Sequence, residues 1–120
     1  MPKYVLLFSY SNEAIKNLTE RPEGRTEAVR ELVESAGGRL ESYYLMFGQY
    51  DGLVIFEVQT SDLASAIAFA VSRTGAVTHL ETHELVNPDH LPAIANRAKG
   101  LSYTPPGGAA AHSAQGARPI

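Results

Sequence analysis

Apolar residues along the first 86 positions follow two patterns, short runs and helical stripes. Runs rich in Val, Leu, Phe and Tyr predict strands at residues 4–10, 40–47 and 53–58, and a fourth strand follows at 77–86. Unbroken apolar runs are typical of strands that bury both faces. Between the strands, apolar residues recur at helical spacing and predict helices over 13–19, 28–36 and 63–73.

Residues that start and end helices mark the boundaries of these elements. Ser11 or Asn12 can cap the first helix, and residues 60–62 offer the same to the last. Gly37-Gly38 ends the middle helix, and residues 48–52 form a hairpin turn between two strands. The order predicts an α+β, ferredoxin-like βαββαβ fold with a four-stranded antiparallel sheet, whose first and third strands are central.

The chain changes character after the fourth strand. Asn87-Pro88 begins a short helix, with Asn as the cap and Pro at the first helical position, and Gly100 ends it. The residues that follow are rich in Pro, Gly and Ala. We therefore predict a ferredoxin-like domain over 1–86, a short C-terminal helix over 87–100, and a tail over 101–120 that is flexible or docked on a partner subunit.

The two central strands are apolar on both faces, although helices can cover only one face of such a sheet. Tyr4, Leu6 and Phe8 alternate with Val5 and Leu7 in the first strand. Monomers rarely expose a large apolar patch. We expect a homo-oligomer in which two sheet faces pack together; the alternative is that the C-terminal helix and tail cover the open face, and both can hold.

Composition narrows the class of function. The 120 residues fit one domain, and a net charge of −3 without a basic stripe speaks against nucleic-acid binding. No apolar run is long enough for a membrane span and no signal-peptide pattern opens the chain, so we expect a cytoplasmic protein with no membrane partner. The chain has no Cys, which excludes thiolate metal sites and Cys nucleophiles.

Several segments spread over residues 1–86 resemble the GYD family. They are Ser11 with Ile15-Lys16-Asn17-Leu18, Arg25 with Ala28, Gly37-Gly38, Tyr44, the turn Gly48-Gln49-Tyr50-Asp51, and Gly75-Ala76-Val77. The resemblance implies a ferredoxin-like fold similar to the dimeric α/β-barrel group, which includes small cofactor-free monooxygenases. The family has no settled biochemical role, so the resemblance implies a fold rather than a reaction.

The segment His79 to His83 is the first candidate for chemistry. On a strand, His79, Glu81 and His83 point to one face, and two imidazoles with a carboxylate are suitable metal ligands. The two histidines would lie about 13 Å apart on a straight strand, so one ion would need a bulge or a second chain. The alternatives are a solvated polar face on an edge strand, or a pocket in which His79 handles protons.

Tyr50-Asp51 in the hairpin is the second candidate. A tight turn can need Asp to bond its own backbone. A phenol beside a carboxylate could instead orient a ligand or move a proton, which makes Tyr50 and Asp51 candidate catalytic residues with His79. Turn geometry leaves Tyr50 without a structural reason.

Aromatic side chains on the strands form the third candidate. Tyr10, Tyr43, Tyr44 and Phe47 fill a core or an interface, or else line an apolar pocket. For a pocket, the expected ligand-binding residues are Tyr44, Met46 and Tyr10.

No phosphate-binding, dinucleotide-binding or hydrolase motif is present, and we expect no cofactor. The leading hypothesis is an oligomeric domain that binds a small apolar or aromatic metabolite and acts as a cofactor-free enzyme or as a binding protein. The alternatives are a non-catalytic assembly module that works through its C-terminal segment, and a His/Glu metal-binding protein.

Overall fold

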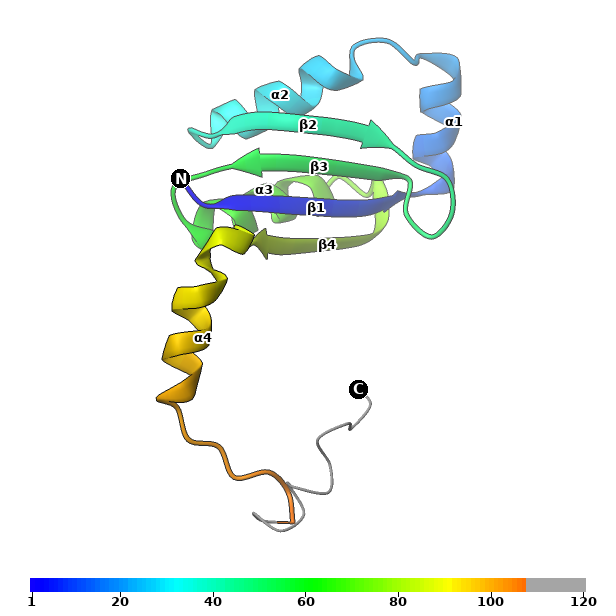
Figure 1. Cartoon of the computed structure of the whole chain (residues 1–120). Helices are drawn as coiled ribbons and strands as arrows, with labels where there is room; N and C mark the ends of the chain where they lie inside the picture. Colours follow the sequence, from blue (N-terminus) through cyan, green and yellow to red (C-terminus); the bar gives the residue numbers. More distant parts are fainter. Residues whose placement is uncertain (108–120) are drawn as a thin grey trace. The chain divides into compact units, whose positions relative to one another are not determined.

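The computed structural model of the chain describes residues 1–107 (Figure 1). It divides into two units, Met1–Val86 and a second unit that begins at Asn87. The elements of the first unit are β1 (Lys3–Tyr10), α1 (Asn12–Glu20), α2 (Arg25–Ser35), β2 (Arg39–Leu45), β3 (Gly52–Glu57), α3 (Ser61–Ser72) and β4 (Val77–Leu85).

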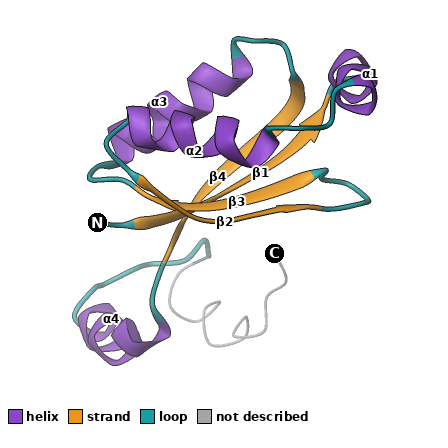
Figure 2. Ribbon diagram, turned by 90° about the horizontal axis from the view of Figure 1, so that it is seen from above, coloured by secondary structure: helices purple, strands orange, loops and turns teal. Residues whose placement is uncertain are grey.

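The four strands form one antiparallel sheet in the order β2-β3-β1-β4. The predicted ferredoxin-like fold is confirmed, and β1 and β3 are the central strands. Figure 2 shows α2 and α3 on one side of the sheet, where α2 packs beside β2 and α3 beside β4. This side is called the helix face below, and the other side the open face.

Alternation along the central strands separates the two faces. Tyr4, Leu6 and Phe8 of β1 are buried on the helix face, as are Val54 and Phe56 of β3. The residues between them are only partly buried and lie on the open face. Val33 of α2 and Ile67 of α3 close the core from the helix side.

The expected helix caps are present. The Ser11 side chain accepts a hydrogen bond from the Ala14 N–H group, and Thr60 accepts one from Leu63. Each cap satisfies one of the backbone donors that a helix N-terminus leaves without a partner.

The second strand ends earlier than the sequence predicts. The prediction placed residues 40–47 in a strand, whereas β2 ends at Leu45 and Phe47 is fully exposed. The Met46 N–H group donates to the Asp51 carbonyl at 2.8 Å, and the Asp51 N–H group donates to the Phe8 carbonyl at 2.7 Å. These bonds close the hairpin and leave residues 47–50 as an outward loop.

The second unit begins with a 3₁₀ turn, Pro88–His90, followed by α4, Leu91–Lys99. The Asn87 side chain accepts from the Asp89 N–H group, as its predicted capping role requires. Residues 101–107 form no helix or strand, and the rest of the predicted tail, 108–120, lies outside the described residues. Within residues 1–107, every helix is too short or too polar to span a membrane.

Candidate functional site

Asp51 fastens the hairpin loop to the neighbouring central strand. Its carboxylate accepts a hydrogen bond from the Tyr10 N–H group at 2.8 Å, and the Ser9 hydroxyl donates to the Gln49 carbonyl at 2.6 Å. The sequence predicted that Asp51 bonds its own turn, whereas it bonds the backbone of β1. These bonds fix where Tyr50 lies. A catalytic role for Asp51 stays a prediction.

Tyr50 reaches across β1 to a polar cluster on the open face of β4. Its hydroxyl donates to Glu81 Oε2, and its ring stacks on the His79 ring with centroids 5.8 Å apart. His79 Nε2 lies 2.9 Å from Glu81 Oε2, and His83 Nε2 lies 2.9 Å from Glu81 Oε1. We call Tyr50, His79, Glu81 and His83 the Glu81 cluster.

Hydrogen bonding fixes the protonation of two members of this cluster. The Tyr50 hydroxyl, followed by the two imidazoles, lowers the pKa of Glu81 to about 2. The same bond to Glu81 raises the pKa of Tyr50. At neutral pH Glu81 is therefore a carboxylate that only accepts, and Tyr50 is a phenol that donates. A carboxylate whose pKa lies this far below neutral pH is a weak general base.

The side chains of the predicted metal ligands form hydrogen bonds with one another. The two imidazole nitrogens approach different oxygens of one carboxylate, so Glu81 lies between them. Among residues 1–107, no group of three or more His, Cys, Asp or Glu side chains is arranged to hold a metal ion. A metal site at His79, Glu81 and His83 stays a prediction.

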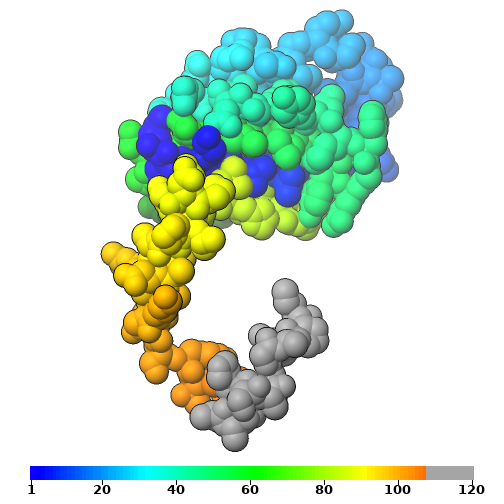
Figure 3. Space-filling view, in the orientation of Figure 1, coloured from blue at the N-terminus to red at the C-terminus, as the bar shows by residue number. Residues whose placement is uncertain are grey.

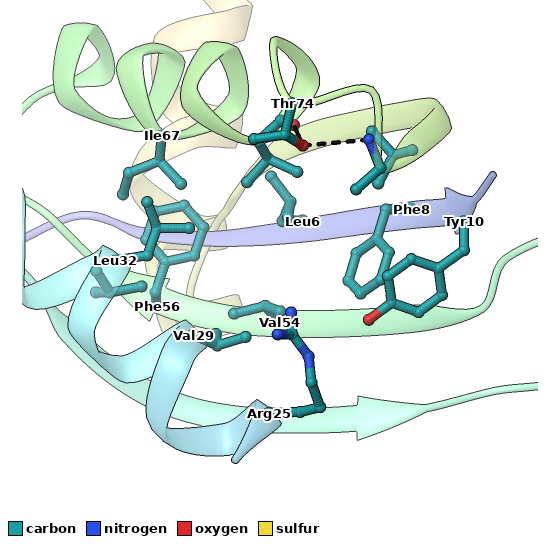
Figure 4. Close-up of a pocket in the computed structure, with 14 residues that line it drawn as sticks. Leu6, Phe8, Tyr10, Arg25, Val29, Leu32, Val54, Phe56, Ile67 and Thr74 are labelled. Carbon is teal, nitrogen blue, oxygen red and sulfur yellow. Dashed lines mark hydrogen bonds between the residues drawn. The ribbon is translucent and has the colours of Figure 1, made fainter. Parts of the chain in front are cut away.

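A separate cavity lies between the sheet and the helices (Figure 4). Its volume is about 140 Å³, and nearly all of its wall is apolar. The lining comes from β1, α2, β3, α3 and the start of β4, and includes Leu6, Phe8, Val29, Val54, Phe56 and Ile67. The cavity is therefore part of the core on the helix face.

One end of the cavity is polar. Figure 4 shows the Tyr10 hydroxyl and the Arg25 guanidinium directed toward each other from β1 and α2. Burial, followed by the neighbouring Tyr43 hydroxyl, raises the pKa of Tyr10 to about 12. Within residues 1–107, Arg25 Nε and the Tyr43 hydroxyl are buried without a hydrogen-bond partner. We call Tyr10 and Arg25 the polar end; Tyr43 neighbours Tyr10 but does not line the cavity.

The predicted ligand-binding residues separate in the structure. Tyr10 lines the cavity, but Tyr44 is 65% exposed on the opposite face and Met46 lies in the hairpin loop. Tyr50, Asp51 and His79 do not line the cavity either. The structure thus brings Tyr50 and His79 together at Glu81, and brings Tyr10 to a different site.

Sequence reasoning missed Arg25 as a candidate binding residue, although a signal was present. Arg25 is the first residue of α2, where the helix dipole disfavours a cation. Arg25 forms no ion pair with the other residues of 1–107, so a cation in that place has a reason outside the helix.

Comparison with known proteins identifies the family of this chain. The family model described as the GYD domain matches residues 4–95. The crystal structure of FFRP-DM1 is 19% identical, with 72% of this chain and 100% of that chain covered and a TM-score of 0.44. The hypothetical protein PHS023 from Pyrococcus horikoshii is 19% identical, with 75% and 95% covered and a TM-score of 0.45. These likenesses are too weak to carry an argument, and no curated protein matches the chain.

Proposed function

The chain belongs to the GYD domain family, and on that premise we propose that residues 1–86 bind a small apolar or aromatic metabolite and assemble with copies of themselves. The cavity between sheet and helices carries the first part of the proposal. The open sheet face supports the second.

The size and lining of the cavity favour a ligand with one ring or a short branched chain. An engineered cavity of about 150 Å³ in another protein binds benzene. Left unfilled, about 140 Å³ would cost on the order of 3 kcal/mol of stability, and an apolar group bound there recovers part of this. Such a cost is large for a small domain, which favours a binding role.

A cofactor-free reaction on the bound metabolite would have few groups to use. Tyr10 and Arg25 are the titratable residues that line the cavity. At neutral pH the Tyr10 phenol keeps its proton, because its pKa is about 12, so it can donate a hydrogen bond but is not available as a base. We therefore place binding first and treat turnover as a further step.

The open face has the character of an assembly surface. Val5, Leu7, Leu53 and Ile55 form an apolar centre of partly buried side chains on β1 and β3. Figure 3 views the sheet from this side, with β1 in blue beside β3 in green. Ion pairs such as Arg39 with Glu57 lie at one end of the face. A second copy that covers the apolar centre would remove it from water.

Ligand binding is tested by adding a ring to the cavity wall. Toluene and indole are titrated into the full chain while backbone amide shifts are followed by NMR. We expect shifts at cavity residues in the natural protein and their loss in Val29→Phe, whose new ring occupies the cavity. Glu31→Phe places the same ring on the exposed side of α2 and should leave binding intact. Absence of binding, or binding unaffected by Val29→Phe, would contradict the proposal.

Assembly is tested by a charge at the centre of the open face. We expect the natural chain to show an oligomeric mass by light scattering, and Leu7→Lys to reduce that mass to the monomer. Glu31→Lys, on α2, is the matched control and should keep the oligomer. A monomeric natural chain would contradict this part alone.

A further inference from the structure

We propose that the cavity takes a small monocarboxylic acid, with its apolar or aromatic body inside and its carboxylate held by Arg25 and the hydroxyl of Tyr10. This inference rests on the proposed function and adds the chemical class of the ligand.

Arg25 supplies the positive charge. Its guanidinium is directed into the wall of an apolar cavity, and its Nε is buried without a partner in the described part of the chain. None of the ion pairs found within residues 1–107 includes Arg25. Buried charged donors are normally paired, and an unpaired one is costly. A ligand that accepts hydrogen bonds and carries negative charge supplies the missing partner.

Tyr10 adds a second donor of fixed position. Its ring packs edge-on against Phe8, with centroids 5.0 Å apart, which holds its hydroxyl at the end of the cavity. Tyr43 of β2 neighbours the Tyr10 hydroxyl from outside the cavity lining. Arg25 can only donate, and the Tyr10 phenol keeps its proton at neutral pH, because its pKa is about 12. A carboxylate has two oxygens and enough lone pairs to accept from both.

The surroundings select a single negative charge. The polar end holds one cation, whereas a phosphate would bring a second negative charge. Tyr10, Arg25 and Ala76 also line an open groove outside the cavity, beside α1. That groove also contains Glu20, Glu23 and Arg21, so its acidic residues balance its basic ones and it offers no net positive charge to a second negative group. A small acid can enter along this groove with its apolar body leading.

The test compares benzoate with two neutral molecules of similar shape, benzamide and toluene. Dissociation constants are measured by NMR titration on the full chain. We expect benzoate to bind more tightly than benzamide. Arg25→Met should weaken benzoate by about 10- to 100-fold, the usual effect of losing a charged hydrogen bond, and leave toluene within about twofold. Tyr10→Phe should weaken benzoate by about fivefold.

Arg21→Met is the matched control, because it removes the same charge from the outer groove without touching the cavity. It should change benzoate binding by less than about threefold. If Arg25→Met does not fold, Arg25→Lys replaces it and should still weaken benzoate, because Lys lacks the planar fork.

Two results overturn the inference and spare the proposed function: toluene binds while benzoate does not, or Arg25→Met weakens benzoate and toluene equally. Loss of benzoate binding to the same extent in Arg21→Met would also overturn it, since general attraction would then suffice. If neither toluene, indole nor benzoate binds, the cavity is not a ligand site and both proposals fail.

Discussion

The two faces of the sheet are built from equally apolar strands but have opposite surroundings. On the helix face, Phe8 and Phe56 are almost completely buried, and Arg25, whose Nε has no hydrogen-bond partner among residues 1–107, lines a cavity. On the open face, Leu7 and Ile55 are only partly buried, and the polar groups of the Glu81 cluster bond one another. Polar groups that already bond one another need no ligand, whereas unpaired ones in a core call for one.

The structure makes the polar end of the cavity a better candidate for ligand binding than the Glu81 cluster, whereas the sequence predicted the opposite. Tyr50, His79, Glu81 and His83 have conspicuous chemistry in the sequence, yet in the structure they bond one another. Arg25 is inconspicuous in the sequence, yet its guanidinium lies at the polar end of an apolar cavity. Hydrogen-bond satisfaction is therefore a better guide to the binding site than residue type.

The largest expected effect comes from truncating neighbouring residues on the two faces. Phe56→Ala removes a fully buried ring that stacks on Tyr4, and should lower the free energy of unfolding by about 3–5 kcal/mol. Ile55→Ala, one residue away on the open face, should cost about 1–2 kcal/mol, because its side chain is only partly buried in one chain. Urea denaturation measures both.

Repeating the unfolding measurements on Phe56→Ala and Ile55→Ala at several protein concentrations tests whether a second copy covers the open face. If a second copy covers the open face, the loss for Ile55→Ala grows with concentration, whereas the loss for Phe56→Ala changes less. Equal losses at low concentration would show that the two faces do not differ as described.

An intermediate effect is expected from adding a methyl group under Phe8. A Cβ atom at Gly52 would lie 2.2 Å from the end of the Phe8 ring, so the ring must move into the cavity that it lines. Gly52→Ala should cost about 1–3 kcal/mol and also weaken toluene binding.

Gly100→Ala is the control, because its Cβ would meet nothing closer than 3.5 Å. Thermal unfolding checks stability, and the NMR titration checks binding. Full stability with unchanged toluene binding in Gly52→Ala would contradict the placement of Phe8.

The smallest expected effect is on the stability of the fold at acid pH. The folded pKa of Glu81 is about 2, below its ordinary value of 4.5. A lowered carboxyl pKa stabilises the fold above pH 4.5, and this contribution is lost as the pH falls from 4.5 toward 2. Glu81→Gln should therefore lose less stability than the natural chain between pH 5 and pH 2, as urea unfolding at each pH would show.

Glu84→Gln, on the same strand but paired opposite Tyr4 on the other face, is the matched control. Glu84→Gln should lose as much stability between pH 5 and pH 2 as the natural chain does. If Glu81→Gln loses as much stability between pH 5 and pH 2 as the natural chain, the hydrogen bonds of the Glu81 cluster are not formed in solution.

The sequence was sufficient for the fold and much less so for the site. Apolar runs and Gly, Asn and Ser boundaries predicted each element of residues 1–86, because strand and helix periods are local properties. The predicted end of β2 was two residues too late, since the bond from the Asp51 N–H group to the Phe8 carbonyl joins residues 43 positions apart. The cluster of Tyr50 with His79 required the same long-range contact.

By itself the sequence determined the order of strands and helices, the apolar character of both sheet faces and membership of the GYD family. Only the tertiary structure decided which face the helices cover, that Glu81 bonds Tyr50 and two histidines, and that Arg25 meets Tyr10 at a cavity. Periodicity records which side chains share a face, but not which distant groups lie within hydrogen-bonding distance. Packing sets those distances, and within residues 1–107 packing placed a cation that has no carboxylate partner there beside an apolar cavity.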